Sequence, residues 1–307
     1  TSLWASGQMS NFTYLMALNT FSGRTFNDIL QYPIFPLITH DMIKISRNLS
    51  FPISYQPKAK ENNEEEEVNE EVFEDSIFLE IEQMFHTSPV PSSTVEKSLI
   101  RMEPFTSYYL KMQSGRFKNL SSKSFTSFDK CELPPEFYFC PEVFENINSF
   151  NIPDFEFNEN CRNCFELVYK HRKMLESDQV SMKLNKWIDL IWGVKQKGKL
   201  ALKFRNYLHP FILEDIWEHD SSLLIEAKRQ IMSMMKLYGT MPQQLFTDLH
   251  PQRTNKQKQD RIINSNEDQV ESNLEFNVVQ KRIHSIPLIY ASCIADNCFL
   301  TIDSRGR

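Results

Sequence analysis

One stretch of the chain, residues 175–198, reads LESDQVSMKLNKWIDLIWGVKQKG and most constrains what the chain can fold into. Its large apolar residues recur at helical spacing on one stripe: Val180, Leu184, Trp187, Ile188, Ile191 and Trp192. Ser177 precedes the stripe as a candidate N-cap, and Gly193 follows it as a natural stop. Because large aromatic side chains dominate core energetics, this stretch predicts a central, buried helix.

The predicted helix is followed by a run of cations. Lys195, Lys197 and Lys199 come directly after it, and Lys203 and Arg205 continue the run. A helix C-terminus favours positive charge, so we expect a solvated basic turn at this end. An alternative use of the same five cations is the binding of anionic lipid at a membrane surface.

Length and composition indicate a globular intracellular protein. The chain has 307 residues and a hydrophobic content of 41%, enough to form one large domain or two small ones. It has no apolar run long enough to span a bilayer and no signal-peptide pattern. Six cysteines do not make a disulfide scaffold in a chain of this length, so we expect a reducing, cytoplasmic compartment. The sequence begins with Thr1 rather than Met, and we expect it to be part of a longer protein.

The net charge of -6 is unevenly distributed. Residues 61–82 contain eleven acidic residues and no Lys or Arg, which leaves 29 acids and 34 bases elsewhere. The body of the chain is therefore mildly basic, and residues 58–75 are expected to form an acidic, disordered insert. A balance this close to neutral does not indicate a nucleic-acid binder, although it is compatible with an anionic membrane surface or an acidic partner.

Two blocks combine prolines with large aromatic residues. Residues 23–36 read GRTFNDILQYPIFP, and residues 132–151 read ELPPEFYFCPEVFENINSFN. Prolines at this density forbid a regular helix or a central strand, so the aromatic residues must be buried on irregular backbone. Buried backbone polar groups need partners, and the first block offers Arg24, Asn27 and Asp28 for that purpose. We interpret the aromatic residues as core, with a peptide-binding groove as the alternative.

Helices are also predicted around these blocks. Ser10 is a candidate N-cap for a short helix before the first block. Residues 160–176 predict an amphipathic helix with Phe165, Val168 and Leu175 facing inward. Residues 224–238 predict a further helix, with Asp220 or Ser221 as its cap.

Several of these stretches resemble, in order, the signatures of the BEACH (beige and Chediak-Higashi) domain family. The matching runs are SNFTYLMALN with the first proline block, LIRMEPFTSYYLKMQSGRFKN, the second proline block, the central helix, and YGTMPQQLFTDLHPQR. The resemblance weakens over residues 48–91, so the chain looks like a divergent member. It implies a BEACH domain over residues 1–253, mainly α, with helices around a core that includes extended, poorly regular segments.

The resemblance also implies neighbours and a function. Family members carry a PH-like domain before this one and a WD40 propeller after it. Residues 254–284 are a polar linker, and residues 285–307 alternate β-rich runs with turns, so we interpret them as the first strands of that propeller. The implied function is non-enzymatic scaffolding of trafficking proteins in vesicle, lysosome or autophagy traffic. We therefore expect a cytoplasmic protein, peripheral on endomembranes, that binds no nucleic acid.

Signals for chemistry are weak. Cys161 and Cys164 form a CxxC pair, but no second pair stands at zinc-site spacing. Asp189 is the most interesting carboxylate, and its simplest interpretation is pairing with a base such as Arg172 or Lys186, or capping of a neighbouring element. We therefore predict no catalytic residue, no metal and no cofactor. The alternative is a metal-dependent hydrolase that uses Asp189 or a zinc site.

Three groups of residues complete the prediction. Those expected to be least buried and to face a partner are Arg24, Arg116, Lys195 and Lys197. Those expected to act as internal polar struts are Ser10, Asn11, Asn27, Asp28, Glu136, Glu176 and Asp189. Those expected in the core are Phe12, Tyr32, Phe35, Phe105, Phe137, Trp187, Ile188 and Trp192.

Overall fold

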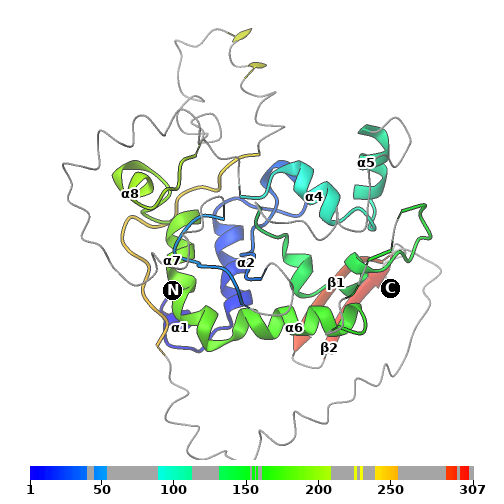
Figure 1. Ribbon diagram of the computed structural model, residues 1–307, viewed down its shortest axis with the longest axis horizontal. Helices are drawn as coiled ribbons and strands as arrows, with labels where there is room; N and C mark the ends of the chain where they lie inside the picture. Colours follow the sequence, from blue (N-terminus) through cyan, green and yellow to red (C-terminus); the bar gives the residue numbers. More distant parts are fainter. Residues whose placement is uncertain are drawn as a thin grey trace, which may run out of the picture.

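A computed structural model of the chain describes most of the domain and the end of the tail (Figure 1). The described residues are 1–39, 45–53, 89–112, 131–152, 154–155, 157, 161–208, 225–226, 229–230, 239–254, 288–295 and 298–303. Arg116, the insert at 58–75 and residues 255–284 lie outside them. Apart from the tail, the described elements are helices and short 3-10 turns, which confirms the prediction of a mainly α fold.

The predicted central helix is α7 (Asp178–Ile191). Ser177 caps it by accepting a hydrogen bond from the Val180 amide, and the helix ends just before Trp192. Every member of the predicted apolar stripe is buried, and the Trp187 and Trp192 rings meet edge to face with centroids 5.4 Å apart. This stripe forms much of the domain core.

Two further helices enclose that core. Helix α2 (Asn11–Phe21) is capped by Ser10, which accepts from the Thr13 amide. Its two ends bond to the corresponding ends of α7, so the two helices run parallel (Figure 1). Helix α6 (Cys164–Glu176) packs across α2, α7 and the two turns η3 (Pro135–Tyr138) and η4 (Pro141–Phe144).

The prediction that Phe165 faces inward is wrong. Its side chain is 45% exposed, whereas the buried stripe of α6 is Cys164, Leu167, Val168, His171 and Leu175. Two of the three predicted residues, Val168 and Leu175, do belong to that stripe, and only Phe165 was misplaced. The position that it was expected to fill is taken by the neighbouring Cys164.

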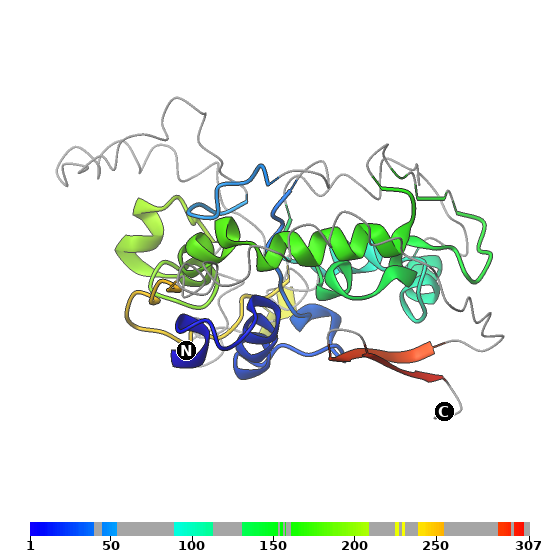
Figure 2. The same cartoon turned by 90° about the horizontal axis from the view of Figure 1, so that it is seen from below.

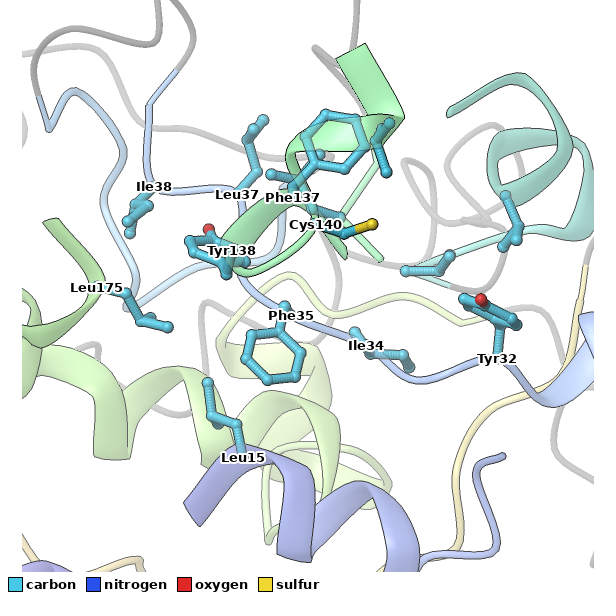
Figure 3. Packing of buried hydrophobic residues seen from close by; sticks show 14 of the residues in the cluster. Leu15, Tyr32, Ile34, Phe35, Leu37, Ile38, Phe137, Tyr138, Cys140 and Leu175 are labelled. Carbon is cyan, nitrogen blue, oxygen red and sulfur yellow. The ribbon is translucent and has the colours of Figure 1, made fainter. Parts of the chain in front are cut away.

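An extended segment, residues 32–38, passes through the core between α2 and the η3 turn (Figure 3). Phe35 forms an isolated antiparallel bridge with Leu133, and both of its hydrogen bonds are 2.9 Å long. The short turn η1 (Ile29–Gln31), capped by Asp28, leads into the segment. Because the segment cannot join a sheet along its length, most of its buried polar groups need side-chain partners.

Side chains supply those partners. The Asn19 amide group accepts from the Ile34 N–H and donates to the Ile34 carbonyl at 2.7 and 3.0 Å. The Tyr138 hydroxyl donates to the Pro36 carbonyl, and the Arg24 guanidinium donates to the Tyr32 carbonyl. The irregular backbone is thus stabilised by dispersed polar residues, which regular strands would not require.

The remaining elements lie around this centre. They are α1 (Ser2–Ala5), α4 (Ser92–Ser98), α5 (Phe105–Met112), α8 (Gly198–Lys203) and the antiparallel strands β1 (Leu288–Ala295) and β2 (Cys298–Asp303). The hairpin confirms the short β-rich tail, while its assignment to a propeller stays a prediction. Of the predicted helix at 224–238, only residues 225–226 and 229–230 are described, and they are helical.

Candidate functional site

A polar cluster joins the two ends of the domain. Asn11 is fully buried at the start of α2, and its amide group donates to the Leu175 carbonyl at 2.7 Å and to Ser181 Oγ at 2.8 Å. Its Oδ1 accepts from Trp4 Nε1 and from the Arg253 guanidinium at 2.5 Å. Asn11 therefore connects Trp4, near the start of the helical domain, with Arg253, near its end.

The Glu176 carboxylate lies at the N-terminus of α2. It accepts from the backbone amides of Asn11 and Phe12 at 2.8 and 3.0 Å. These amides have no partner within the helix, and the positive end of the helix dipole favours an anion. Arg172 reaches the same carboxylate at 3.6 Å and lies 3.7 Å above the Phe12 ring, which is half-buried against the core.

A second cluster forms where α7 ends. Asp189 is 1% exposed, and its Oδ1 accepts from the His250 amide at 2.9 Å while its Oδ2 lies 3.6 Å from Lys195 Nζ. Burial raises the pKa of Asp189 and lowers that of Lys195, and each partner's charge opposes the shift in the other. Asp189 is thus paired with a base, as predicted, but that base is Lys195 rather than Arg172 or Lys186. At 1% exposure, Asp189 has no open face for a substrate.

Two of the residues expected to face a partner are buried, so that expectation of exposure is wrong for them. Lys195 is 5% exposed because its ammonium turns back to Asp189 and packs 3.9 Å above the Phe204 ring. Arg24 is 4% exposed because it donates to the carbonyls of Tyr32 and Thr240, which belong to irregular backbone. Lys197 is half-buried.

One expected strut is also misplaced. Asn27 is exposed, and the contact described for it is made by its backbone amide, which donates to Thr25 Oγ1 at 3.2 Å. The neighbouring Asp28 takes the capping role instead, since its carboxylate accepts from the Leu30 amide. Either residue type can cap a turn, so the sequence alone did not distinguish between them.

A third cluster surrounds Glu132, which the sequence reasoning missed. Arg47 donates to both Glu132 oxygens at 2.5 and 2.7 Å, and Trp187 Nε1 and the Leu37 amide donate to the same carboxylate. The Arg47 and Glu132 side chains are 0% and 2% exposed. The position of Glu132 shortly before Pro134 and Pro135 could have indicated a buried acid that binds irregular backbone. No sequence feature near Arg47 indicated that it pairs with Glu132.

Glu136 lies in the same part of the core. Its Oε1 accepts from the Tyr32 hydroxyl at 2.5 Å. Burial raises the pKa of Glu136 to about 7, although the hydrogen bond from Tyr32 acts in the opposite direction. A carboxyl group this deeply buried holds the extended segment rather than exchanging protons with a ligand.

Two buried histidines are held in the neutral form. Burial lowers the pKa of His171 to about 4, and its Nδ1 lies 3.2 Å from the Phe137 carbonyl. Burial also lowers the pKa of His250 to about 4, and its Nε2 lies 2.9 Å from the Tyr14 hydroxyl. Both imidazoles contact protein groups of the core, so their altered pKa values reflect burial rather than a catalytic cleft.

The cysteines of the CxxC pair do not share a ligand set. Cys164 donates to a Glu145 carboxylate oxygen at 2.9 Å, and burial raises the pKa of both thiols. In the part of the chain that the structure describes, no three His, Cys, Asp or Glu residues are grouped as metal ligands would be.

The surface offers features of a different kind. Several large apolar side chains are exposed, with Phe21 at 73%, Leu249 at 67% and Ile147 at 55%. Lys199 and Lys203 of α8 are exposed, and Leu200 and Leu202 between them are 40% and 39% exposed. The ionisable groups of the interior thus support the fold, and the exposed apolar and basic residues are the ones available to partners.

A mainly helical domain built around irregular, polar-braced core segments is the class of protein that this geometry defines. The Beige/BEACH domain family model matches residues 2–253, and the chain belongs to that family. The matched range covers the described helices from α1 to α8 and ends at Arg253, which binds Asn11.

Curated relatives agree with this assignment. The human lysosomal-trafficking regulator is 34% identical over 299 residues, covering 82% of this chain and 8% of that protein. The SPIRRIG protein of Arabidopsis thaliana is 32% identical over 284 residues (83% of the chain, 8% of the relative), and the Drosophila melanogaster lysosomal-trafficking regulator is 33% identical over 289 residues (82% and 8%). The chain therefore spans about a twelfth of the length of these relatives.

Among the residues that the structure describes, no helix combines the length and the apolar character needed to cross a bilayer. The longest, α7, has 14 residues.

Proposed function

We propose that this chain is a non-enzymatic scaffold domain that holds protein partners during intracellular membrane traffic. Membership of the BEACH family supports this, as does the similarity to two proteins named lysosomal-trafficking regulator. In this proposal the domain works in the cytoplasm, peripheral to endomembranes, in vesicle, lysosome or autophagy-related traffic. A PH-like domain and a WD40 propeller of the same longer chain are its proposed neighbours.

The observation that carries the non-enzymatic part is the state of Asp189. A catalytic carboxylate needs a free oxygen and access to substrate. Asp189 is 1% exposed, one of its oxygens binds the His250 amide, and the other faces Lys195. These contacts support a structural role for the residue that most resembled a catalytic acid in the sequence.

Proximity labelling in cells tests the scaffold role. The parent protein would carry a labelling enzyme, and the wild type would be compared with a variant carrying Trp187→Ala and Ile188→Ala. Both side chains are fully buried, so the variant loses the folded domain without changing the surface directly. Lys97→Ala with Lys111→Ala is the control, since both lysines are exposed.

We expect trafficking proteins among the wild-type and control labels and their loss from the core variant. The same labelled set from all three proteins would refute a scaffold role for this domain. Turnover of a substrate by the purified wild type, lost in a folded Asp189→Asn variant, would instead support an enzyme.

A further inference from the structure

We propose that the contact between the Tyr32 hydroxyl and the Glu136 carboxyl is a proton-controlled clamp on the extended segment, residues 32–38. A proton on Glu136 keeps the segment closed, and loss of that proton favours opening of the segment. The segment crosses the middle of the domain in both views, so its opening loosens the packing around it (Figures 1 and 2). This regulatory role goes beyond protein scaffolding and does not depend on it.

The geometry of Glu136 favours its protonated form. Glu136 lies in η3 and is 6% exposed, and its Oε1 accepts from the Tyr32 hydroxyl at 2.5 Å. Its Oε2 is buried and has no hydrogen-bond partner among the residues that the structure describes. A carboxylate in water is solvated at both oxygens, so burial with one oxygen unbonded costs the ionised form much more than the neutral acid. The closed segment is therefore most stable when Glu136 carries a proton.

Cys140 is the titratable neighbour of Glu136 where η3 meets η4. Its thiol donates to Glu142 Oε2 at 3.3 Å. Burial raises the pKa of this thiol, and the carboxylates of Glu142 and Glu136 raise it further. Cys140 therefore stays neutral, and Glu142 is an acid that cannot stabilise a second negative charge beside it.

The described charged groups on the other packed elements are directed elsewhere. From α6, His171 contacts the Phe137 carbonyl through Nδ1 at 3.2 Å, and burial lowers its pKa to about 4, so it is neutral near neutral pH. Arg47 forms its ion pair with Glu132. These contacts leave protonation as the way in which Glu136 avoids a buried charge.

Protonation and opening are coupled with a definite sign. Burial raises the pKa of Glu136 to about 7, while the Tyr32 hydroxyl and the residue's own backbone amide act in the opposite direction; the ordinary value is 4.5. Between these two values the closed segment holds a proton that the open segment releases. The clamp is thus fully effective below the ordinary value and is lost as the pH rises through about 7. Through Glu136 alone, the equilibrium constant for opening should rise about 20-fold between about pH 5.5 and about pH 7.5.

The clamp holds the end of the segment that is nearest to solvent. Figure 3 shows Tyr32 at one end of the segment and Ile38 at the other. The Tyr32 ring meets the Phe26 and Phe105 rings edge to face, with centroids 5.6 and 5.9 Å away, and Phe26 is 44% exposed. Opening at this end therefore exposes aromatic side chains, which links the proton concentration to the apolar surface that the domain presents.

Carbon-13 NMR of the purified chain tests whether Glu136 takes up a proton near neutral pH. The signal of its side-chain carboxyl carbon would be assigned by its absence from a Glu136→Gln variant. We expect a titration midpoint at about pH 7. Tyr32→Phe should move the midpoint upward, because it removes the hydroxyl that lowers the pKa. A midpoint below about pH 5, or a carboxyl that stays protonated up to about pH 8, would overturn the proposal.

Amide hydrogen exchange tests whether that proton controls opening. The Ile34 amide donates to Asn19 Oδ1 and the Phe35 amide donates to the Leu133 carbonyl, so both exchange only when the segment opens. Their rates would be corrected for the intrinsic dependence of exchange on pH. The wild type would then be compared with the Glu136→Gln variant, whose side chain is neutral at every pH.

We expect the ratio of opening in the wild type to opening in Glu136→Gln to rise about 20-fold between about pH 5.5 and about pH 7.5. Taking the ratio removes the contributions of His171 and His250, which have the opposite sign. Glu142→Gln is the control and should follow the wild type. An unchanged ratio would overturn the proposal. If Glu136→Gln did not fold, the wild-type titration and its shift in Tyr32→Phe would decide the question.

Neither experiment measures the binding of a partner. The clamp can therefore fail while the scaffold proposal succeeds, and the reverse is also possible.

Discussion

Gly193 provides the sharpest test of how the end of α7 is packed. A Cβ atom built on this residue would lie 2.7 Å from Asp189 Cα and 2.9 Å from Asp189 Oδ1. The first of these atoms belongs to the helix backbone and cannot rotate away. Gly198 is the matched control, because its φ is +72° but a Cβ there meets no atom within 4 Å.

Gly193→Ala should be the more destabilising of the two substitutions. Overpacking of this kind costs about 1–3 kcal/mol. The added methyl group would also push Asp189 away and so disturb its hydrogen bond from the His250 amide. A hydrogen bond to a charged group contributes about 1.5–3 kcal/mol. We expect a total loss of about 3–5 kcal/mol. Gly198→Ala should cost about 1–2 kcal/mol, because an L-residue there is strained only by its left-handed backbone.

Urea denaturation followed by tryptophan fluorescence would measure both free energies of unfolding. A thermal melt should show the same order, with a shift of roughly 2–4 °C for each kcal/mol in a domain of this size. If Gly193→Ala were no more destabilising than Gly198→Ala, the close approach to Asp189 would not be a feature of the folded protein.

The polar residues Glu132, Arg253 and His171 each allow a separate test. Glu132→Gln should destabilise the fold by about 3–5 kcal/mol, because it leaves the charge of Arg47 buried without an anionic partner. Urea denaturation would measure this change, and a loss below about 1 kcal/mol would contradict the prediction. Arg253→Ala should remove the bonds to Asn11 and Met9 and speed amide hydrogen exchange in residues 1–9 before it affects α7, whereas an unchanged pattern would argue against the cluster. His171 has a pKa of about 4 in the fold and 6.5 in the unfolded chain, so the unfolded state binds more protons between these values. His171 should therefore lower the stability by up to about 3 kcal/mol as the pH drops from 6.5 to 4. A folded His171→Gln variant should lose this part of the pH dependence, whereas the part due to His250, whose pKa is also about 4, should remain.

The buried face of α7 could be predicted from the sequence because it depends on local spacing. A helix period places Trp187 and Ile188 on the same face as Leu184, and Ser177 caps wherever an amide of the first turn is within reach. The family assignment was readable for a related reason, since the matching runs keep fixed letters at fixed spacing.

The partners of the buried polar residues could not be predicted from the sequence in this way. Arg24 and Lys195 are charged residues next to loops, which usually lie in solvent. In this fold Arg24 meets a carbonyl at Thr240, and Glu132 meets Arg47 across 85 residues of chain. No local pattern in one sequence encodes such a pairing.

The sequence by itself determined the helices α2, α6 and α7, the caps Ser10 and Ser177, and the existence of irregular aromatic segments, because these depend on neighbours within a few residues. Only the tertiary structure decided which charged groups are buried and which stay outside. Burial of a charge is favourable only when a distant partner lies within bonding distance, as Asp189 and the His250 amide provide for each other. Whether such a partner lies close enough is decided only when the chain packs. Lys195 has one in Asp189 and is buried, whereas Lys199, four residues later, is exposed.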